Sequence, residues 1–178
     1  MPSLPEKIVA VDEALDSADI PHAFGGALAL AWCTQRARGT IDIDVNVFVD
    51  VERAREVVAA MPSEVTWAEA DLALLERDGQ VRIWWDSTPL DLFLNTTEYH
   101  AQVAGRARRE LFVGRDVPFL SCTDLAVFKV FFDRTKDWAD LEEMVAAGTL
   151  DTDRVVGVLV RYLGADDDRV ARLLALTG

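Results

Sequence analysis

The sequence predicts an α/β (α+β) fold, with a mixed β-sheet flanked by helices and followed by a helical C-terminal tail. Helical apolar spacing alternates with short β-branched segments as far as residue 120, and only helical spacing follows. Hydrophobic residues make up 51% of the 178 positions, which is enough to bury a sizeable core. We therefore expect a core of residues 1–120 and a helical region of residues 121–178 packed on it.

The individual elements follow from the same patterns. Apolar spacing predicts helices at residues 4–16, 27–37, 51–60, 67–77 and 97–109, and from residue 122 to the end with breaks near Gly148 and Gly164. Alternating and β-branched segments predict strands at residues 22–24, 41–49, 81–85, 90–94, 110–113 and 117–120. The turn residues 86–89 predict that the strands on either side form an antiparallel hairpin. Ser121 is expected to cap the first helix of the tail.

Charge is unevenly distributed along the chain. The net charge of -13 argues against sequence-independent binding to nucleic acid, which needs a basic surface. Residues 101–136 nevertheless carry seven basic and four acidic side chains. This locally basic segment either serves a phosphate-bearing ligand or is an ordinary solvated surface, and the sequence leaves both interpretations open.

Cysteine and histidine usage limits the kinds of site to expect. Cys33 and Cys122 lie in apolar helical segments without CxxC spacing, so we expect buried free thiols. His22 and His100 are far apart, which disfavours a histidine-rich metal site. No apolar run reaches the roughly 20 residues of a membrane span, and the N-terminus lacks the apolar core of a signal peptide. We expect a cytoplasmic protein with no membrane partner.

A pair of aspartates offers the first candidate site. Asp42 and Asp44 are two residues apart on a predicted strand, so their carboxylates project from one face. Asp91 completes a cluster of three if its strand pairs beside residues 41–49. Hard cations such as Mg²⁺ take oxygen ligands, and a two-metal site suits an in-line phosphoryl displacement. The alternative is the polar face of a solvated strand; Asp86, a competing acid, fits a turn better.

Glycines and arginines surround this pair in the sequence. Gly25 and Gly26 separate a predicted strand from a helix, where backbone N–H groups can approach phosphate oxygens. A tight strand-to-helix turn is the simpler explanation for the doublet. Arg36 and Arg38 precede the aspartate strand, and they either contact nucleotide phosphates or face solvent.

Two blocks of the chain resemble known families. Phe24-Gly25-Gly26, Asp42-Ile43-Asp44 and Asp91 resemble the signature of the DNA polymerase β-type nucleotidyltransferase superfamily, with somewhat longer spacing than the shortest family patterns. Residues 121–144, SCTDLAVFKVFFDRTKDWADLEEM, resemble the C-terminal motif of AbiEii/MenT-type nucleotidyltransferase toxins of bacterial toxin–antitoxin systems. The residues that match this second motif are Lys129, Arg134, Lys136, Asp137, Asp140 and Leu141.

The resemblance implies a nucleotidyltransferase core that moves a nucleoside monophosphate from ATP or another NTP to an acceptor hydroxyl and releases pyrophosphate. Asp42, Asp44 and Asp91 would hold two Mg²⁺ ions, and Lys129 would balance charge on the triphosphate. The nucleotide-binding residues would be Gly25, Gly26, Arg36, Lys129 and Asp137. The acceptor would be a tRNA 3′ end, and the partner a cognate antitoxin protein. Two alternatives remain: a small-molecule transferase of the antibiotic-modifying kind, and a catalytically inert interaction module with the same fold.

Overall fold

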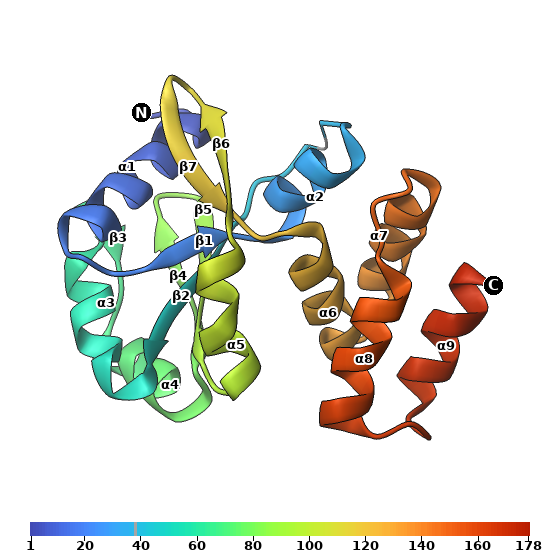
Figure 1. Cartoon of the computed structure of the whole chain (residues 1–178). Helices are drawn as coiled ribbons and strands as arrows, with labels where there is room; N and C mark the ends of the chain where they lie inside the picture. The colour runs from blue at the N-terminus through green and yellow to red at the C-terminus, as the bar shows by residue number, and fades with distance from the viewer. Residues whose placement is uncertain (38) are drawn as a thin grey trace. The chain divides into compact units, whose positions relative to one another are not determined.

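The computed structural model describes residues 1–37 and 39–178 and divides into two compact units (Figure 1). The first, here called the sheet unit, comprises Met1–Leu28 and Gly39–Leu120. The second, the helical unit, comprises the segment that begins at Ala29 together with Ser121–Gly178. The sequence suggested a division along the chain at residue 120, whereas the helical unit also takes in a segment from the first quarter of the chain.

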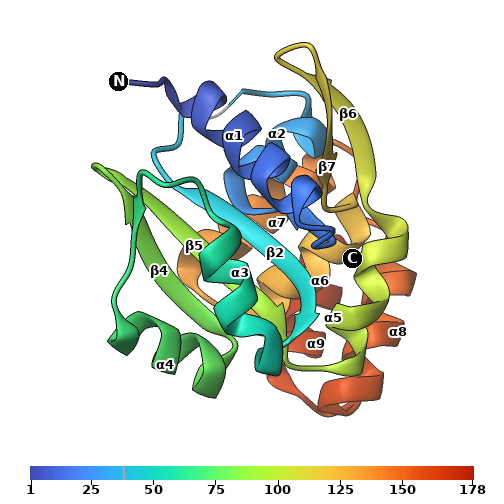
Figure 2. The ribbon, with the colours of Figure 1, turned by 90° about the vertical axis from the view of Figure 1, so that its left-hand side faces the viewer.

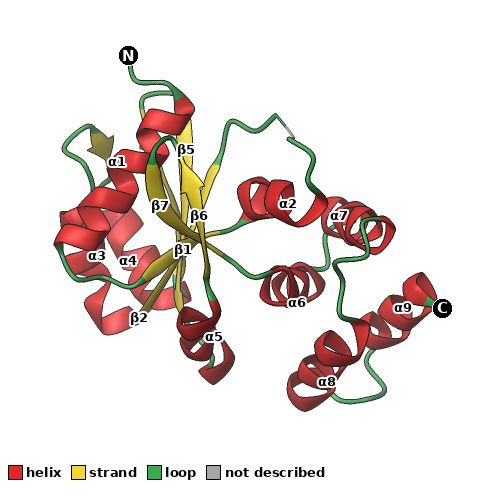
Figure 3. Ribbon diagram, turned by 45° about the horizontal axis from the view of Figure 1, so that its top comes forward, coloured by secondary structure: helices red, strands yellow, loops and turns green. Residues whose placement is uncertain are grey.

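The described residues of the sheet unit form one mixed seven-stranded sheet (Figure 3). The strands are β1 (His22–Phe24), β2 (Ile43–Asp50), β3 (Val65–Thr66), β4 (Gln80–Trp85), β5 (Thr88–Asn95), β6 (Arg108–Phe112) and β7 (Arg115–Phe119), in the order β3-β4-β5-β2-β1-β7-β6. The pairs β2–β5 and β1–β7 are parallel, and the remaining neighbours are antiparallel. The predicted fold class, a mixed sheet flanked by helices, is confirmed.

Helices cover the apolar face of the sheet. The helices of this unit are α1 (Leu4–Ser17), α3 (Ala54–Ala60), α4 (Glu69–Asp78) and α5 (Glu98–Val103). Figure 2 shows α1 and α3 in front of the sheet. Ile43, Val45 and Val47 alternate along β2 and are buried, as a two-residue period requires. On the opposite face, α5 covers the far end of β2, where the Phe48 and His100 rings meet edge to face at 5.6 Å.

Two predicted elements have different bounds in the structure. The helix expected at residues 97–109 ends early: α5 and a short 3₁₀ turn (Ala104–Arg106) are followed by strand β6. Pairing of β6 with β7 outweighs the helical propensity of its residues. The strand expected from Ile41 begins at Ile43, and the Ile41 side chain is 73% exposed. Asp42 therefore lies immediately before β2.

The helical unit contains most of α2 (Gly26–Thr34) and the C-terminal helices α6 (Cys122–Phe132), α7 (Thr135–Ala146), α8 (Thr152–Leu163) and α9 (Asp168–Thr177). Helix α6 contacts α7, α8 and α9. The predicted cap is confirmed, since the Ser121 hydroxyl accepts a hydrogen bond from the Asp124 N–H. Asp133 has a left-handed backbone and ends α6, so residues 129–140 do not form one continuous helix. None of the helices in the described part of the chain combines the length and apolarity needed to span a bilayer.

The expectation of free thiols was wrong. Cys33 of α2 and Cys122, the first residue of α6, form a disulfide within the helical unit. The partners are 89 residues apart in sequence, and no local spacing marks such a pair. This bond ties the early segment of the helical unit to its C-terminal helices.

Candidate active site

The register of three neighbouring strands aligns two aspartates and an arginine in one row across the sheet. Parallel pairing of β2 with β5 sets Asp44 opposite Asp91, and antiparallel pairing of β4 with β5 sets Arg82 opposite Asp91. Asp42, two residues before Asp44, lies within reach of the same arginine. The structure therefore brings together Asp42, Asp44 and Asp91 on the face of the sheet opposite α1 and α3.

Arg82 connects the acids of this row. Its Nε and one terminal nitrogen donate to the two Asp91 carboxylate oxygens, each at 2.7 Å, and the same terminal nitrogen lies 3.5 Å from Asp42 Oδ2. The hydrogen bonds that Arg82 donates to Asp91, with the negative charges of Asp91, Asp42 and Asp44, raise the pKa of the Arg82 guanidinium above its usual value. Its side chain is 47% exposed, and that of Asp91 is 19% exposed, so solvent reaches the row.

The glycine doublet lies directly against Asp44. The Gly25 N–H donates to the Asp44 carbonyl at 2.9 Å, so this donor is used to join the start of α2 to β2. Gly26 has a left-handed φ of +52°, and a Cβ there would overlap the Asp44 carboxylate, at 2.6 Å from its Cγ. Only glycine fits between the β1–α2 turn and this carboxylate. Of the two N–H groups expected to approach a phosphate, that of Gly25 is therefore already donated within the fold.

Asp86 lies apart from the row, in the turn between β4 and β5. Lys7 of α1 is almost fully buried and donates to the Trp85 carbonyl at 3.0 Å and to Thr88 Oγ1 at 2.9 Å, with the Asp86 carboxylate at 3.4 Å. The interpretation of Asp86 as a turn residue agrees with this placement.

The remaining predicted nucleotide contacts belong to the helical unit. Lys129 of α6 is buried and donates to Asp140 at 2.6 Å, with Asp137 at 3.6 Å, and Arg134 donates to both oxygens of Asp137. Asp137 is thus a buried partner of two cations, and its oxygens are engaged. Arg36, also in this unit, is exposed, whereas Arg38 lies outside the described residues.

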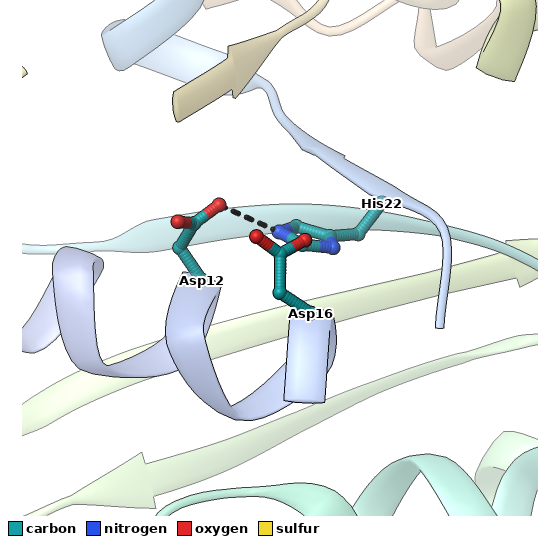
Figure 4. Close-up of side chains that lie close together, drawn as sticks. All are labelled: Asp12, Asp16 and His22. Carbon is teal, nitrogen blue, oxygen red and sulfur yellow. Dashed lines mark hydrogen bonds and ion pairs between the residues drawn. The ribbon is translucent and has the colours of Figure 1, made fainter. Parts of the chain in front are cut away.

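A second cluster of ionisable groups joins α1, β1 and β7 in the sheet unit. Among the described residues, Asp12, Asp16 and His22 offer three potential metal-ligand atoms within 4.8 Å of one another (Figure 4). His22 Nε2 lies 3.0 Å from Asp12, and Arg115 pairs with both Asp12 and Asp16. Burial acts to raise the Asp12 pKa, but hydrogen bonds from His22 and Arg115 together outweigh it and leave that pKa below its usual value. Arg115 already supplies positive charge here, so we interpret the cluster as a fold-stabilising network.

Arg82 is the residue of the row that sequence reasoning missed. The hairpin was predicted, with a turn between residues 85 and 90, and its observed register pairs Trp85 with Thr88. Counting three residues outward from that pair on each strand reaches Arg82 and Asp91. The signal was available once the turn was known to contain only two residues.

Three solved structures are similar to the chain over most of its length. The solution structure of the antibiotic-resistance factor ANT(2'')-Ia has 16% identity, covers 96% of this chain and 95% of its own, and has a TM-score of 0.60. A crystal structure of ANT(2'')-Ia in complex with adenylyl-2''-tobramycin has 17% identity, coverage of 96% and 97%, and a TM-score of 0.59. The lincomycin-bound lincosamide antibiotic adenylyltransferase LnuA has 10% identity, coverage of 79% and 96%, and a TM-score of 0.54.

Sequence comparison adds no closer relative: no family model and no curated protein matches the chain. The TM-scores of 0.54–0.60 to the three structures establish a shared fold. The chain has a nucleotidyltransferase fold.

Proposed function

We propose that this protein is a metal-dependent nucleotidyltransferase that moves a nucleoside monophosphate from an NTP to an acceptor hydroxyl and releases pyrophosphate. The observation that carries the proposal is the row of Asp44 and Asp91 on adjacent parallel strands, with Asp42 beside it and Gly26 against the Asp44 carboxylate. The fold shared with the three transferase structures supports the same chemistry.

The donor set of the row fits a hard divalent cation. Asp42, Asp44 and Asp91 offer carboxylate oxygens, which Mg²⁺ prefers, and partial exposure leaves room for water and phosphate oxygens. Three like charges side by side also favour a bound cation. Two such ions, when bound, would supply positive charge to the attacking and leaving oxygens of the displacement.

Each candidate site residue has a proposed task in this reaction. Asp42 and Asp44 would hold the ions and so orient the nucleotide, and Asp91 would assist removal of the proton from the acceptor hydroxyl. The Gly26 N–H, at the start of α2, binds a phosphate oxygen. For Lys129 and Arg36, both in the helical unit, we propose binding to the negatively charged triphosphate, and Asp137 holds Lys129 in place within that unit.

The acceptor is proposed to be a small hydroxyl-bearing molecule with amino groups. The net charge of -13 favours a cationic acceptor over a polyanion. Two of the similar structures are described by their antibiotic ligands or products, lincomycin and adenylyl-2''-tobramycin.

The second candidate is a tRNA 3′ end modified by a toxin under antitoxin control. Resemblance of residues 121–144 to the toxin motif and the basic segment 101–136 favour this candidate.

The test measures transfer directly. The protein is incubated with Mg²⁺ and each α-labelled NTP in turn, and either aminoglycosides and lincosamides or total tRNA is added. We expect labelled antibiotic and stoichiometric pyrophosphate with the parent protein and neither with Asp44→Asn. Label in tRNA would select the second candidate. The absence of transfer and of nucleotide binding under all these conditions would refute nucleotidyl transfer.

A further inference from the structure

The ion pair between Arg82 and Asp91 has no task in the chemistry proposed above. Arg82 uses two donors on Asp91, and one of them also approaches Asp42. Its position is set by the cross-strand register of β4 and β5, so it does not depend on the conformation of a loop. The strand register therefore holds the Arg82 guanidinium beside the carboxylates of Asp91 and Asp42.

This guanidinium competes with a cation for the same carboxylates. A carboxylate has about four lone-pair directions, and the forked contact fills one on each Asp91 oxygen. A divalent ion on the remaining directions would lie roughly 5 Å from the guanidinium charge. Even in a water-like dielectric, repulsion at that distance weakens binding by about tenfold.

We infer that Arg82 is an internal counter-ion that opposes divalent-cation binding at Asp42 and Asp91 until a nucleoside triphosphate draws its side chain away. The inference rests on the proposed function, because it takes the three acids as the cation ligands. A triphosphate offers oxygens that a guanidinium binds with the same forked geometry. The half-exposed side chain is free to make that exchange. Cation and nucleotide then bind with positive coupling, each raising the affinity of the other by the same factor.

The experiment measures Mn²⁺ binding to the full chain by the electron paramagnetic resonance of free Mn²⁺, without nucleotide and with α,β-methylene-ATP. Arg82→Gln and Arg82→Met remove the charge, and Arg82→Lys keeps it. Arg55→Gln is the matched control, since Arg55 makes a similar two-bond contact with Glu69 on an exposed surface. Without nucleotide, Gln and Met should tighten Mn²⁺ binding about tenfold, and Lys and the Arg55 variant should resemble the parent. The nucleotide should strengthen Mn²⁺ binding more in the parent than in the Gln or Met variants.

Two results separate failure of this inference from failure of the proposed function. Unchanged or weaker Mn²⁺ binding in both neutral Arg82 variants, with binding that still depends on Asp44, would overturn the counter-ion role alone. If Asp44→Asn leaves Mn²⁺ binding unchanged in both the parent and the Arg82→Gln background, the acids do not hold the cation. That outcome would overturn the inference together with the proposed metal site.

Discussion

Replacing Gly26 by alanine tests the contact between the β1–α2 turn and the acid row. A left-handed backbone at a non-glycine residue costs roughly 1–2 kcal/mol. The new Cβ would also overlap the Asp44 carboxylate, at 2.6 Å from Cγ, and force that side chain off its rotamer for roughly another 0.5–1.5 kcal/mol. We expect Gly26→Ala to lower the free energy of unfolding by about 1.5–3.5 kcal/mol.

Both stability and function report on this change. For a chain of this size, the loss corresponds to a fall of roughly 3–14 °C in unfolding temperature, measurable by circular dichroism. Displacement of Asp44 should also reduce transfer by about 100-fold or more, since errors near 1 Å in placement have that effect. Gly105→Ala is the matched control, because no heavy atom lies within 4 Å of a Cβ at that position. A Gly26→Ala protein with the parent's unfolding temperature and full Mg²⁺–ATP binding would refute the reasoning.

Three further predictions concern stability and charge. Asp12 has a lowered pKa in the fold, so its contribution to stability is present above about pH 3.9 and is lost as pH falls through the lowered value. Urea unfolding at several pH values should show that Asp12→Asn is about 1.5–3 kcal/mol less stable at pH 7 and has a flatter acid limb. Lys129→Ala leaves two buried carboxylates without their lysine, so the free energy of unfolding should fall by about 3–5 kcal/mol. The same variant should bind NTP more weakly in calorimetric titrations. Lys136 is exposed, so Lys136→Ala should change neither quantity. Reduction of the disulfide, which closes a long loop, should lower stability by about 2–4 kcal/mol in thermal scans with and without dithiothreitol, and an unchanged transition would contradict its presence.

The sheet and its acids were predictable because their signals are local. Alternation along residues 43–49 identified a strand, and the hairpin turn identified two further strands, β4 and β5, as neighbours of each other. A strand that carries Asp91 between Leu90 and Leu92 must present the acid on the face away from the apolar core. The pairing of β5 beside β2, which the sequence left open, then sets Asp91 opposite Asp44.

Features that depend on long-range pairing were not predictable in the same way. The Cys33–Cys122 bond and the membership of α2 in the helical unit join residues far apart in sequence. Helix was predicted from residue 122 without a break before Gly148, yet Lys129 and Asp140 pair across two helices separated by a left-handed Asp133.

The two-residue turn between β4 and β5 controls which side chains meet at the acid row. Side chains on a strand alternate between faces, so inserting or deleting one residue in this turn would exchange Arg82 for an apolar neighbour opposite Asp91. Lys7 holds the turn through the Trp85 carbonyl and the Thr88 hydroxyl, and thereby opposes such a slip from the other face of the sheet. A single insertion or deletion at residues 86–87 would consequently be enough, during evolution, to remove this arginine from the acids or to bring it beside them.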